Sequence, residues 1–408
     1  MTRSRGERLA RQSLNADTLQ DILADLGIEV RFNELVHKVQ IYDRDKILCE
    51  SEQPLDTLIA YICDTFRDSY KFCGKEQVAQ SLHLIAVRHP VNPILDKVRN
   101  ASRELDSDNY IREIAGSIMR IPQEDVLSHT LVHKWFLQAM ALAQNDSTSP
   151  FGGDGMLVLS GAQGIGKSLF CDCAALDSQY YRVLTLNPYQ DDADILSKAS
   201  GAFVGEFGEL EKSLKPSTIE MFKAFITANK DSYRPKYGRA VNDYVRRTSF
   251  IATCNTNAFL FDKTGNRRFW VIPCREQFDI NRLARCKTGE DDIFARAYAQ
   301  AYKELRENGM QSFRLTDAER QQLEKRNAGY MCVPSIDSIL QSLIESGGLP
   351  DEFTIEELKQ ECSDLGAYDN GKIGRALSRF GLPQHIRKTH RSDGRQTTER
   401  VYNSGIKS

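Results

Sequence analysis

The stretch LVLSGAQGIGKSLF, residues 157–170, joins an apolar run to a glycine-rich loop and then to a segment that can begin a helix. It fits the pattern G-x-x-x-x-G-K-[ST], with Gly161, Gly166, Lys167 and Ser168 at the fixed positions. With average residue usage, a chance match somewhere in a chain of 408 residues has a probability of about one in a hundred. The strand–loop–helix setting that this phosphate-binding loop requires is also present. The stretch therefore predicts a nucleotide site in an α/β domain.

Each residue type in this loop has a physical role in binding phosphates. Glycine at Gly161, Gly164 and Gly166 lets backbone N–H groups wrap an anion without obstruction from a Cβ atom. Lys167 is expected to reach the β- and γ-phosphates, and the Ser168 hydroxyl is expected to be a ligand of Mg²⁺. The N-terminus of the following helix adds a favourable field for the anion. A nucleotide with Mg²⁺ is therefore the expected ligand.

Apolar runs of strand length surround this loop in the sequence. They read MLVLS, YYRVLTL, AFVGEF, SFIATC and RFWVIPC, and segments with helical patterning separate them. This alternation predicts a mostly parallel sheet covered by helices. A polar, glycine-rich stretch at 145–155 predicts a boundary before the sheet, and the amphipathic pattern of IFARAYAQAYKELREN predicts a helix after it. We therefore assign residues 146–312 to an α/β P-loop domain.

Polar side chains follow two of the predicted strands, where a P-loop needs partners for the metal and the attacking water. In AFVGEFGELE, Glu206 ends the apolar run and is the first choice for the acidic role, Glu209 is the second, and Glu211 is interpreted as a solvated charge at a helix start. The alternative is that all three are ordinary surface acids. In SFIATCNTN, Asn255 can orient a water against the γ-phosphate, and a turn-forming asparagine pair is an equal alternative.

Basic and aromatic residues interleave around a glycine in KDSYRPKYGRAVNDYVRR, residues 230–247. Cations for phosphates together with an aromatic ring for base stacking suit single-stranded nucleic acid. The candidate contacts are Arg234, Lys236, Tyr237 and Arg239. A solvated hairpin without a partner is the alternative.

Two adjacent arginines, Arg267 and Arg268, stand between a glycine turn and an apolar strand in FDKTGNRRFWVIP, residues 261–273. Long cationic side chains commonly snorkel at a strand edge, and this is the simplest interpretation of the pair. A functional role requires support from the rest of the chain.

Composition limits the classes of protein that fit. The net charge is -2, so any contact with nucleic acid must come from local patches. The ten cysteines include no C-x-x-C pair, which argues against a zinc ribbon. The N-terminus is charged without an apolar leader, and no run is long enough to span a bilayer, so we expect a cytoplasmic protein without membrane contact. Residues 1–145 read as a mostly helical region for oligomerisation or for contact with a partner or DNA.

The C-terminal part, residues 335–408, has the pattern of three helices followed by a hairpin that turns at Asp393-Gly394. That order predicts a winged helix-turn-helix. Between residues 371 and 401, eight lysines and arginines oppose two acids, which favours phosphate contacts. The candidate DNA contacts there are Lys372, Arg375, Arg379, Lys388, Arg391 and Arg395. A winged helix that binds protein is the alternative.

The motifs GAQGIGKS, EFGELE, YRPKYGR, FIATCNTN and GNRRFW, in this order, resemble the virulence-associated protein E family. These are AAA+-like ATPases related to superfamily 3 helicases, found in phages, prophages and mobile pathogenicity islands. The match spans about residues 155–273. The family's acidic motif usually has two adjacent acids, whereas two residues separate Glu206 from Glu209 here. This leaves the division of labour between metal ligand and water activation open.

The resemblance implies an ATP-dependent DNA helicase in a bacterial host cell, assembled as a hexameric ring and working with a primase or other replication proteins. It implies that Arg267 or Arg268 acts as an arginine finger in a neighbouring subunit's site, stabilising transition-state charge. It also implies that Asn255 is the sensor and that the region of Lys236 and Tyr237 grips DNA in a central channel. The alternatives are an ATP-switched initiator or helicase loader, and a regulatory P-loop protein that does not act on DNA.

Overall fold

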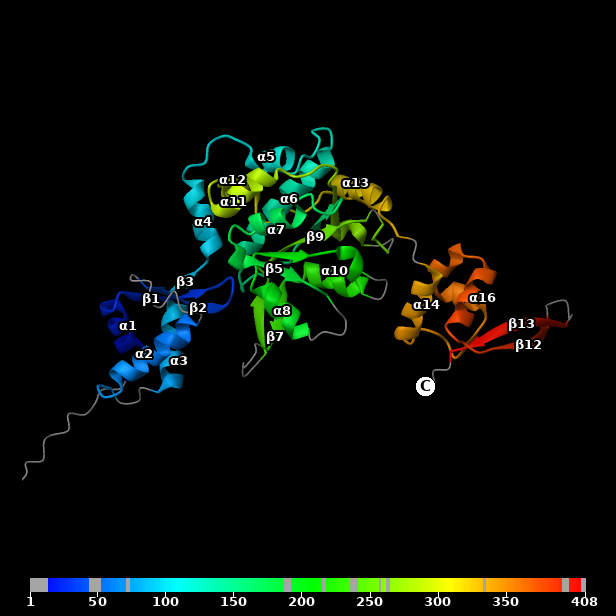
Figure 1. The fold of residues 1–408 in the computed structure, drawn as a ribbon, viewed down its shortest axis with the longest axis horizontal. Helices are drawn as coiled ribbons and strands as arrows, with labels where there is room; N and C mark the ends of the chain where they lie inside the picture. The colour runs from blue at the N-terminus through cyan, green and yellow to red at the C-terminus, as the bar shows by residue number, and fades with distance from the viewer. Residues whose placement is uncertain are drawn as a thin grey trace, which may run out of the picture.

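The computed structural model comprises an N-terminal module, a central α/β body and a C-terminal unit (Figure 1). The residues that it describes are 14–43, 53–70, 74–186, 192–214, 218–234, 241–256, 258–261, 265–332, 335–390 and 396–404. In this part of the chain, no helix is long and apolar enough to cross a membrane.

The central body is built on a 5-stranded parallel sheet in the order β10-β4-β9-β6-β5. Each of the five apolar runs forms one strand, so the predicted parallel sheet is confirmed. The strands are β4 (Met156–Ser160), β5 (Tyr181–Leu184), β6 (Val204–Phe207), β9 (Ser249–Cys254) and β10 (Phe269–Pro273). Every residue of β4, β6 and β9 is buried, as expected when helices cover both faces of a parallel sheet.

Alternate residues of the central strand β4 enter two separate cores. Leu157 and Leu159 belong to the core under α6, α7 and α12, whereas Met156 and Val158 belong to the core over α8 and α10. Figure 1 shows these two sets of helices on opposite sides of the sheet. The helices of the body are α7 (Lys167–Ala174), α8 (Asp192–Ser200), α9 (Leu210–Ser213), α10 (Ile219–Thr227), α11 (Ile280–Thr288), α12 (Ile293–Asn308) and α13 (Asp317–Ala328). The amphipathic helix predicted after the sheet is α12, and its apolar face is buried.

The core between the sheet and α6, α7 and α12 extends across the boundary expected at 145–155. It includes residues of α4 (Pro93–Ser102), α5 (Tyr110–Glu113), the π-helical turn η1 (Ile114–Ile118) and α6 (Val126–Ala143). From α6, the Trp135 indole N–H donates to the Phe250 carbonyl at 2.9 Å, and Gln138 donates to the Gly155 carbonyl at 2.8 Å. We therefore propose that the α/β unit begins near residue 93 and that 145–155 is a loop within it.

The N-terminal module contains strands that a mostly helical region does not predict. A 3-stranded sheet in the order β2-β1-β3 packs with three helices around its own core. Its elements are α1 (Ala16–Asp25), β1 (Ile28–Asn33), β2 (Lys38–Asp43), α2 (Pro54–Phe66), α3 (Lys75–Arg88) and β3 (Pro90–Val91). In β1, the sequence IEVRFN alternates apolar with polar side chains, which is the pattern of a half-buried strand. Helices do make up most of residues 1–145, but these strands were not predicted, because the alternating pattern of β1 is only six residues long and β3 has only two residues.

The C-terminal unit has its own hydrophobic core. It contains the predicted helices α14 (Ile336–Glu345), α15 (Ile355–Glu361) and α16 (Asn370–Arg379), and the predicted hairpin of β12 (Gln384–His390) and β13 (Gln396–Asn403). Two short elements are added, β11 (Glu352–Phe353) and the 3₁₀ turn η4 (Ser363–Ala367), and the sheet order is β11-β13-β12. Glu319 and Glu357 complete capping boxes with Thr316 and Thr354, which define the starts of α13 and α15.

Candidate nucleotide site

The loop between β4 and α7 has a backbone that requires glycine. Gly166 has φ of 103°, and a Cβ atom there would lie 2.5 Å from Ile280 Cδ1. A Cβ atom on Gly161 would lie 2.2 Å from the Cys274 carbonyl oxygen. Gly164 also has a positive φ, 81°, in open space. A loop this close to the neighbouring backbone fits the phosphate cradle that its sequence predicts.

Lys167 and Asn255 are in contact beside this loop. The Lys167 ammonium donates to the Gly161 and Ala162 carbonyls, both at 2.6 Å, and to Asn255 Oδ1 at 3.0 Å. Only 6% of Lys167 is exposed, and this burial lowers the pKa of its ammonium. The strands β4 and β9 are adjacent and parallel, so the residues that follow them meet at the same edge of the sheet.

Glu206 faces Ser168 across the same edge. The Ser168 hydroxyl donates to Glu206 Oε1 at 2.8 Å, and the Thr253 hydroxyl donates to the same oxygen at 3.0 Å. Glu206 is 2% exposed and has no ion pair with any residue that the structure describes. A buried carboxylate without a cation beside it is costly, so it depends on such donors.

Sequence reasoning missed Tyr181, whose hydroxyl donates to Glu206 Oε2. Burial and this hydrogen bond raise the pKa of Tyr181 above its usual value, so the hydroxyl keeps its proton. Tyr181 begins β5, which pairs with β6, the strand of Glu206. Its position could be found only by knowing that these two strands are neighbours.

The other two acids are placed differently from what the sequence suggested. Glu209 adopts a left-handed backbone with φ of 50°, and its half-exposed carboxylate pairs with Lys212 at 2.7 Å. Glu211 Oε1 instead accepts from the Asn255 backbone N–H at 3.2 Å, and its buried Oε2 has no hydrogen-bond partner in the described part of the chain. The interpretation of Glu211 as a solvated charge is therefore wrong, and of these two acids Glu211 is the one that contacts Asn255.

These residues fit a nucleotide with Mg²⁺. A hydroxyl and a carboxylate are the hard oxygen donors that Mg²⁺ prefers, and substrate phosphates commonly complete its coordination. The described residues contain no cluster of three or more His, Cys, Asp or Glu side chains able to hold a metal. Ser168 and Glu206 would therefore hold the ion only together with the phosphates, as in other P-loop sites.

Arg267 and Arg268 lie at the opposite edge of the sheet. They occupy the 3₁₀ turn η3 (Asn266–Arg268), which precedes β10, whereas the P-loop follows the parallel strand β4. The length of a five-residue strand, roughly 16 Å, separates the two edges. Arg267 is exposed and Arg268 is half-buried, and neither forms an ion pair with a described residue. Successive side chains in a strand point to opposite faces, but both arginines lie in a turn, so this rule does not show which of them points outward from the subunit.

The predicted basic hairpin is β7 (Lys230–Tyr233) paired with β8 (Asn242–Val245). Its base is anchored by a buried pair in which Arg246 Nε donates to Asp231 at 2.5 Å, and Arg246 also donates to the Phe225 carbonyl at 3.1 Å. Arg234 is exposed where β7 ends. The candidates Lys236, Tyr237 and Arg239 lie outside the described residues.

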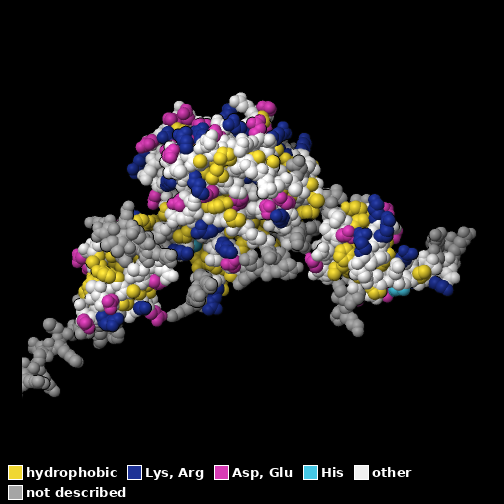
Figure 2. All heavy atoms as spheres, viewed as in Figure 1, with side chains coloured by type: hydrophobic (Ala, Val, Ile, Leu, Met, Phe, Trp, Pro, Cys, Tyr) yellow, Lys and Arg dark blue, Asp and Glu magenta, His cyan; other side chains and the backbone are white. Residues whose placement is uncertain are grey.

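Several basic candidates of the C-terminal unit are exposed, and some are paired. Arg379 pairs with Asp337 at 2.5 Å, and Lys372 lies 3.8 Å from Asp369. Arg375 donates to the Gly371 carbonyl at 3.2 Å, and Lys388 is exposed on β12. Lys and Arg side chains gather on the visible face of this unit in Figure 2. Arg391 and Arg395 lie outside the described residues.

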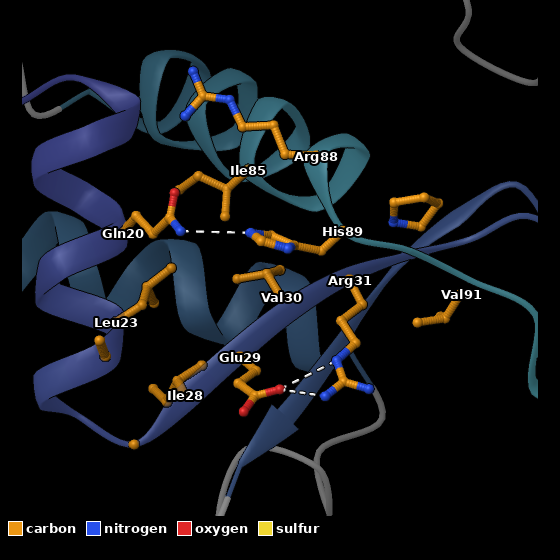
Figure 3. Close-up of a pocket in the computed structure, with 13 residues that line it drawn as sticks. Gln20, Leu23, Ile28, Glu29, Val30, Arg31, Ile85, Arg88, His89 and Val91 are labelled. Carbon is orange, nitrogen blue, oxygen red and sulfur yellow. Dashed lines mark hydrogen bonds and ion pairs between the residues drawn. The ribbon is translucent and has the colours of Figure 1, made fainter.

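A separate hollow lies in the N-terminal module between α1, α3 and β1 (Figure 3). Its walls include Leu23, Val30 and Ile85, and Gln20 and His89 are in contact across it at 3.4 Å. The arginines on its rim are paired with acids, Arg31 with Glu29 at 2.5 Å and Arg88 with Asp17 at 2.7 Å. Its apolar walls and neutralised arginines distinguish it from a phosphate site.

Comparison with known proteins places this chain in a family. A search of curated proteins found no match. Among solved structures, the chain is similar to an apo structure of the NrS-1 C-terminal region, with 12% identity, a TM-score of 0.42 and coverage of 97% of this chain and 100% of that one. It is also similar to an X-ray structure of JCV helicase, with 12% identity, a TM-score of 0.32 and coverage of 75% and 82%. The family model of the virulence-associated protein E-like domain matches residues 99–332, which is more than half of the chain. The chain belongs to the virulence-associated protein E-like family.

Proposed function

We propose that this protein is an ATP-dependent DNA helicase of phage or mobile-element replication, with an AAA+-like P-loop core. The observation that carries the proposal is the meeting of two pairs at one sheet edge, Lys167 with Asn255 and Ser168 with Glu206. These four polar side chains come from the start of α7, from β6 and from the residue after β9, and with the glycine loop they suit a metal-bound triphosphate.

Each residue has a distinct task in this site. The loop N–H groups and Lys167 bind the phosphates, and Ser168 and Glu206 hold Mg²⁺, which when bound neutralises phosphate charge. Glu211 accepts the proton of the attacking water, because its Oε2 is buried and has no described partner while its Oε1 is fixed by Asn255. Glu209 is the second candidate for this task, since a movement of its exposed side chain could bring it to the water.

The position of the arginines supports a ring. Arg267 and Arg268 cannot reach the P-loop of their own chain from the other edge of the sheet. Cations at such a turn, with no ion pair to a described residue, can enter the site of a neighbouring copy and stabilise the γ-phosphate in the transition state. A closed ring, with six subunits as in the related helicases, gives every site such a neighbour.

DNA would contact two regions. The hairpin of β7 and β8, anchored at its base by Arg246 and Asp231, would hold single-stranded DNA in the channel. The order helix, strand, helix, helix and two-stranded hairpin supports a winged-helix unit at the C-terminus. In that unit α16 would enter the major groove, with Arg375 and Lys372 on its exposed surface.

An initiator or helicase loader that binds DNA without unwinding it is the second candidate. The separate core of the C-terminal unit favours it, because a self-contained DNA-binding unit can recognise an origin without a motor. A primase or another replication protein is the expected partner in either case.

Unwinding of a labelled fork by the purified protein, with ATP and Mg²⁺, tests the proposal. We expect strand separation by the intact chain and none by Lys167→Ala, in which the ammonium that contacts the loop is absent. DNA binding and ATP hydrolysis without strand separation would instead favour the loader. Absence of salt-sensitive DNA binding would exclude both candidates.

A further inference from the structure

Glu206 is held by an unusual set of hydroxyl donors. Ser168 and Thr253 donate to Oε1, and Tyr181 donates to Oε2. The Cys171 thiol also lies against Glu206, and burial together with this contact raises the pKa of the thiol. A thiol is a weak donor, so the three hydroxyls carry most of the stabilisation of the carboxylate.

The two oxygens of Glu206 have different surroundings. Oε1 faces Ser168, the residue that a P-loop uses as a metal ligand, so this oxygen lies on the metal side. Oε2 faces away from it, toward Tyr181. A metal bound by both Ser168 and Oε1 takes a lone pair from each oxygen and repels the hydroxyl proton, so the proton turns away from Oε1 and that hydrogen bond is lost. The hydrogen bond from Tyr181 needs no such change.

We propose that Tyr181 is a positioning residue that holds Glu206 by Oε2, so that Oε1 stays aimed at the metal when Ser168 turns to bind it. The inference rests on the proposed function, because it assigns the metal to Ser168 and Glu206. Hydrogen bonds to the outer oxygen of a metal-binding carboxylate orient it, and their loss typically costs roughly 10–100-fold in metal affinity or activity.

The fold explains why a tyrosine can do this from another strand. In the register of β5 and β6, Tyr181 is opposite Val204, two residues before Glu206 and therefore on the same face of the sheet. Neighbouring strands lie about 4.8 Å apart and a strand rises about 3.3 Å per residue, so this diagonal is roughly 8 Å, which a tyrosine side chain spans. A serine or threonine at this position would not reach the carboxylate.

The chain offers a matched control in the preceding residue. Tyr180 is also buried, and its hydroxyl accepts a hydrogen bond from Asn33 at 3.0 Å and does not contact Glu206. Tyr180→Phe and Tyr181→Phe therefore remove the same atom from adjacent residues, and only the second removes a bond to the proposed metal ligand.

The test measures the affinity of a fluorescent ATP analogue for each full-length variant, once with Mg²⁺ and once with EDTA. For Tyr181→Phe we expect the gain in affinity that Mg²⁺ provides to fall about tenfold, with the EDTA affinity unchanged. With Mn²⁺ in place of Mg²⁺, the electron paramagnetic resonance spectrum of the bound metal should also change. Tyr180→Phe should match the intact protein in all three measurements.

Two results would overturn the proposal. One is an unchanged Mg²⁺ effect in Tyr181→Phe, and the other is an equal loss of affinity with Mg²⁺ and with EDTA, because the hydroxyl would then support the loop and not the carboxylate. Ser168→Ala and Glu206→Gln separate this failure from failure of the proposed function. If these two variants also keep the full Mg²⁺ effect, the metal site itself is wrong.

Discussion

The two edges of the central sheet differ in how completely their charges are satisfied. At the carboxyl edge, the buried Lys167 ammonium donates hydrogen bonds to its own chain, and the buried Glu206 carboxylate accepts them from its own chain. At the amino edge, Arg267 and Arg268 follow a glycine turn and have no ion pair with a described residue. A buried charge must be paired or hydrogen-bonded to be stable, whereas water solvates an exposed charge that has no partner. The difference is the basis of our proposal that one chain holds most of a nucleotide site and supplies an arginine to the site of its neighbour.

Removal of the arginines should give the largest effect. We expect Arg267→Ala or Arg268→Ala to lower ATP hydrolysis by about a thousandfold or more, as for other arginine fingers, with ATP binding unchanged. The other substitution should have a small effect, because only one side chain needs to reach the phosphate. Steady-state hydrolysis and equilibrium nucleotide binding measured on assembled protein would distinguish the two.

Mixing subunits sharpens this result. Lys167→Ala keeps both arginines but has a defective P-loop. The inactive arginine variant keeps an intact P-loop but lacks the arginine. If the arginine acts in trans, a mixture of the two should recover part of the hydrolysis that each lacks. Normal hydrolysis by both arginine variants in assembled rings would refute the assignment.

The second-largest effect should distinguish Glu211 from Glu209 as the residue that activates water. We expect Glu211→Gln to lower the rate of hydrolysis by roughly 100-fold, the contribution of a general base, while nucleotide affinity is retained. Glu209→Gln should be nearly silent, since Glu209 pairs with Lys212 at the surface. Single-turnover hydrolysis measures both. The opposite ranking would mean that Glu209 turns inward when nucleotide binds.

The sequence predicted most of the carboxyl edge because its signals are local. The glycines, Lys167 and Ser168 are adjacent in the chain, and Glu206 and Asn255 each end or follow a recognisable apolar strand. Parallel strands bring such ends to one edge whatever their exact order. The five strands and the position of Lys167 beside Asn255 could therefore be anticipated.

The remaining features depend on information that a short window does not contain. The contact of Tyr181 with Glu206 requires β5 and β6 to be neighbours, and nothing in either segment specifies the strand order. The sequence favoured Glu209 over Glu211 as the second acid, but Glu211 is the one that contacts Asn255 after β9. This depends on the left-handed backbone of Glu209, which turns the chain. The strand β1 was missed because its alternating pattern is brief and stands among longer helical patterns.

A smaller effect is expected from removing the side chain that supports η3, the turn that contains Arg267 and Arg268. Asn327 on α13 donates to the carbonyls of Asn266 at 2.8 Å and Phe269 at 2.9 Å, on either side of the arginines. We expect Asn327→Ala to lower hydrolysis about tenfold and to lower the free energy of unfolding by about 1–3 kcal/mol, because two carbonyls lose a side-chain donor. ATP binding should be unchanged.

Hydrolysis and thermal unfolding of Asn327→Ala should be compared with those of Asn308→Ala, a substitution at the exposed end of α12. The control should leave both properties as in the intact protein. A loss of ATP binding in Asn327→Ala, equal to its loss of hydrolysis, would contradict a role confined to the amino edge.

The smallest effect is expected where the N-terminal module meets the amino edge. His37 lies against the Tyr244 ring, with ring centroids 4.6 Å apart, and Arg247 donates to the Glu34 carbonyl at 2.6 Å. Burial, and then the Arg247 charge, lower the pKa of His37 from 6.5 to about 4. The unfolded chain therefore binds a proton that the folded chain does not between these pH values, so stability falls as the pH decreases from 6.5 toward 4.

Replacement of His37 by a side chain that does not titrate should weaken this pH dependence. His37→Asn is suitable because asparagine tolerates the left-handed backbone of His37, which has φ of 53°. Between pH 7.5 and pH 5, we expect the melting temperature of the variant to fall by about 2–4 °C less than that of the intact protein. An equal fall in both proteins would mean that the contact of the N-terminal module with the amino edge does not respond to His37. The pH dependence would then have to come from other groups, because the Arg247 contact with the Glu34 carbonyl does not titrate in this range.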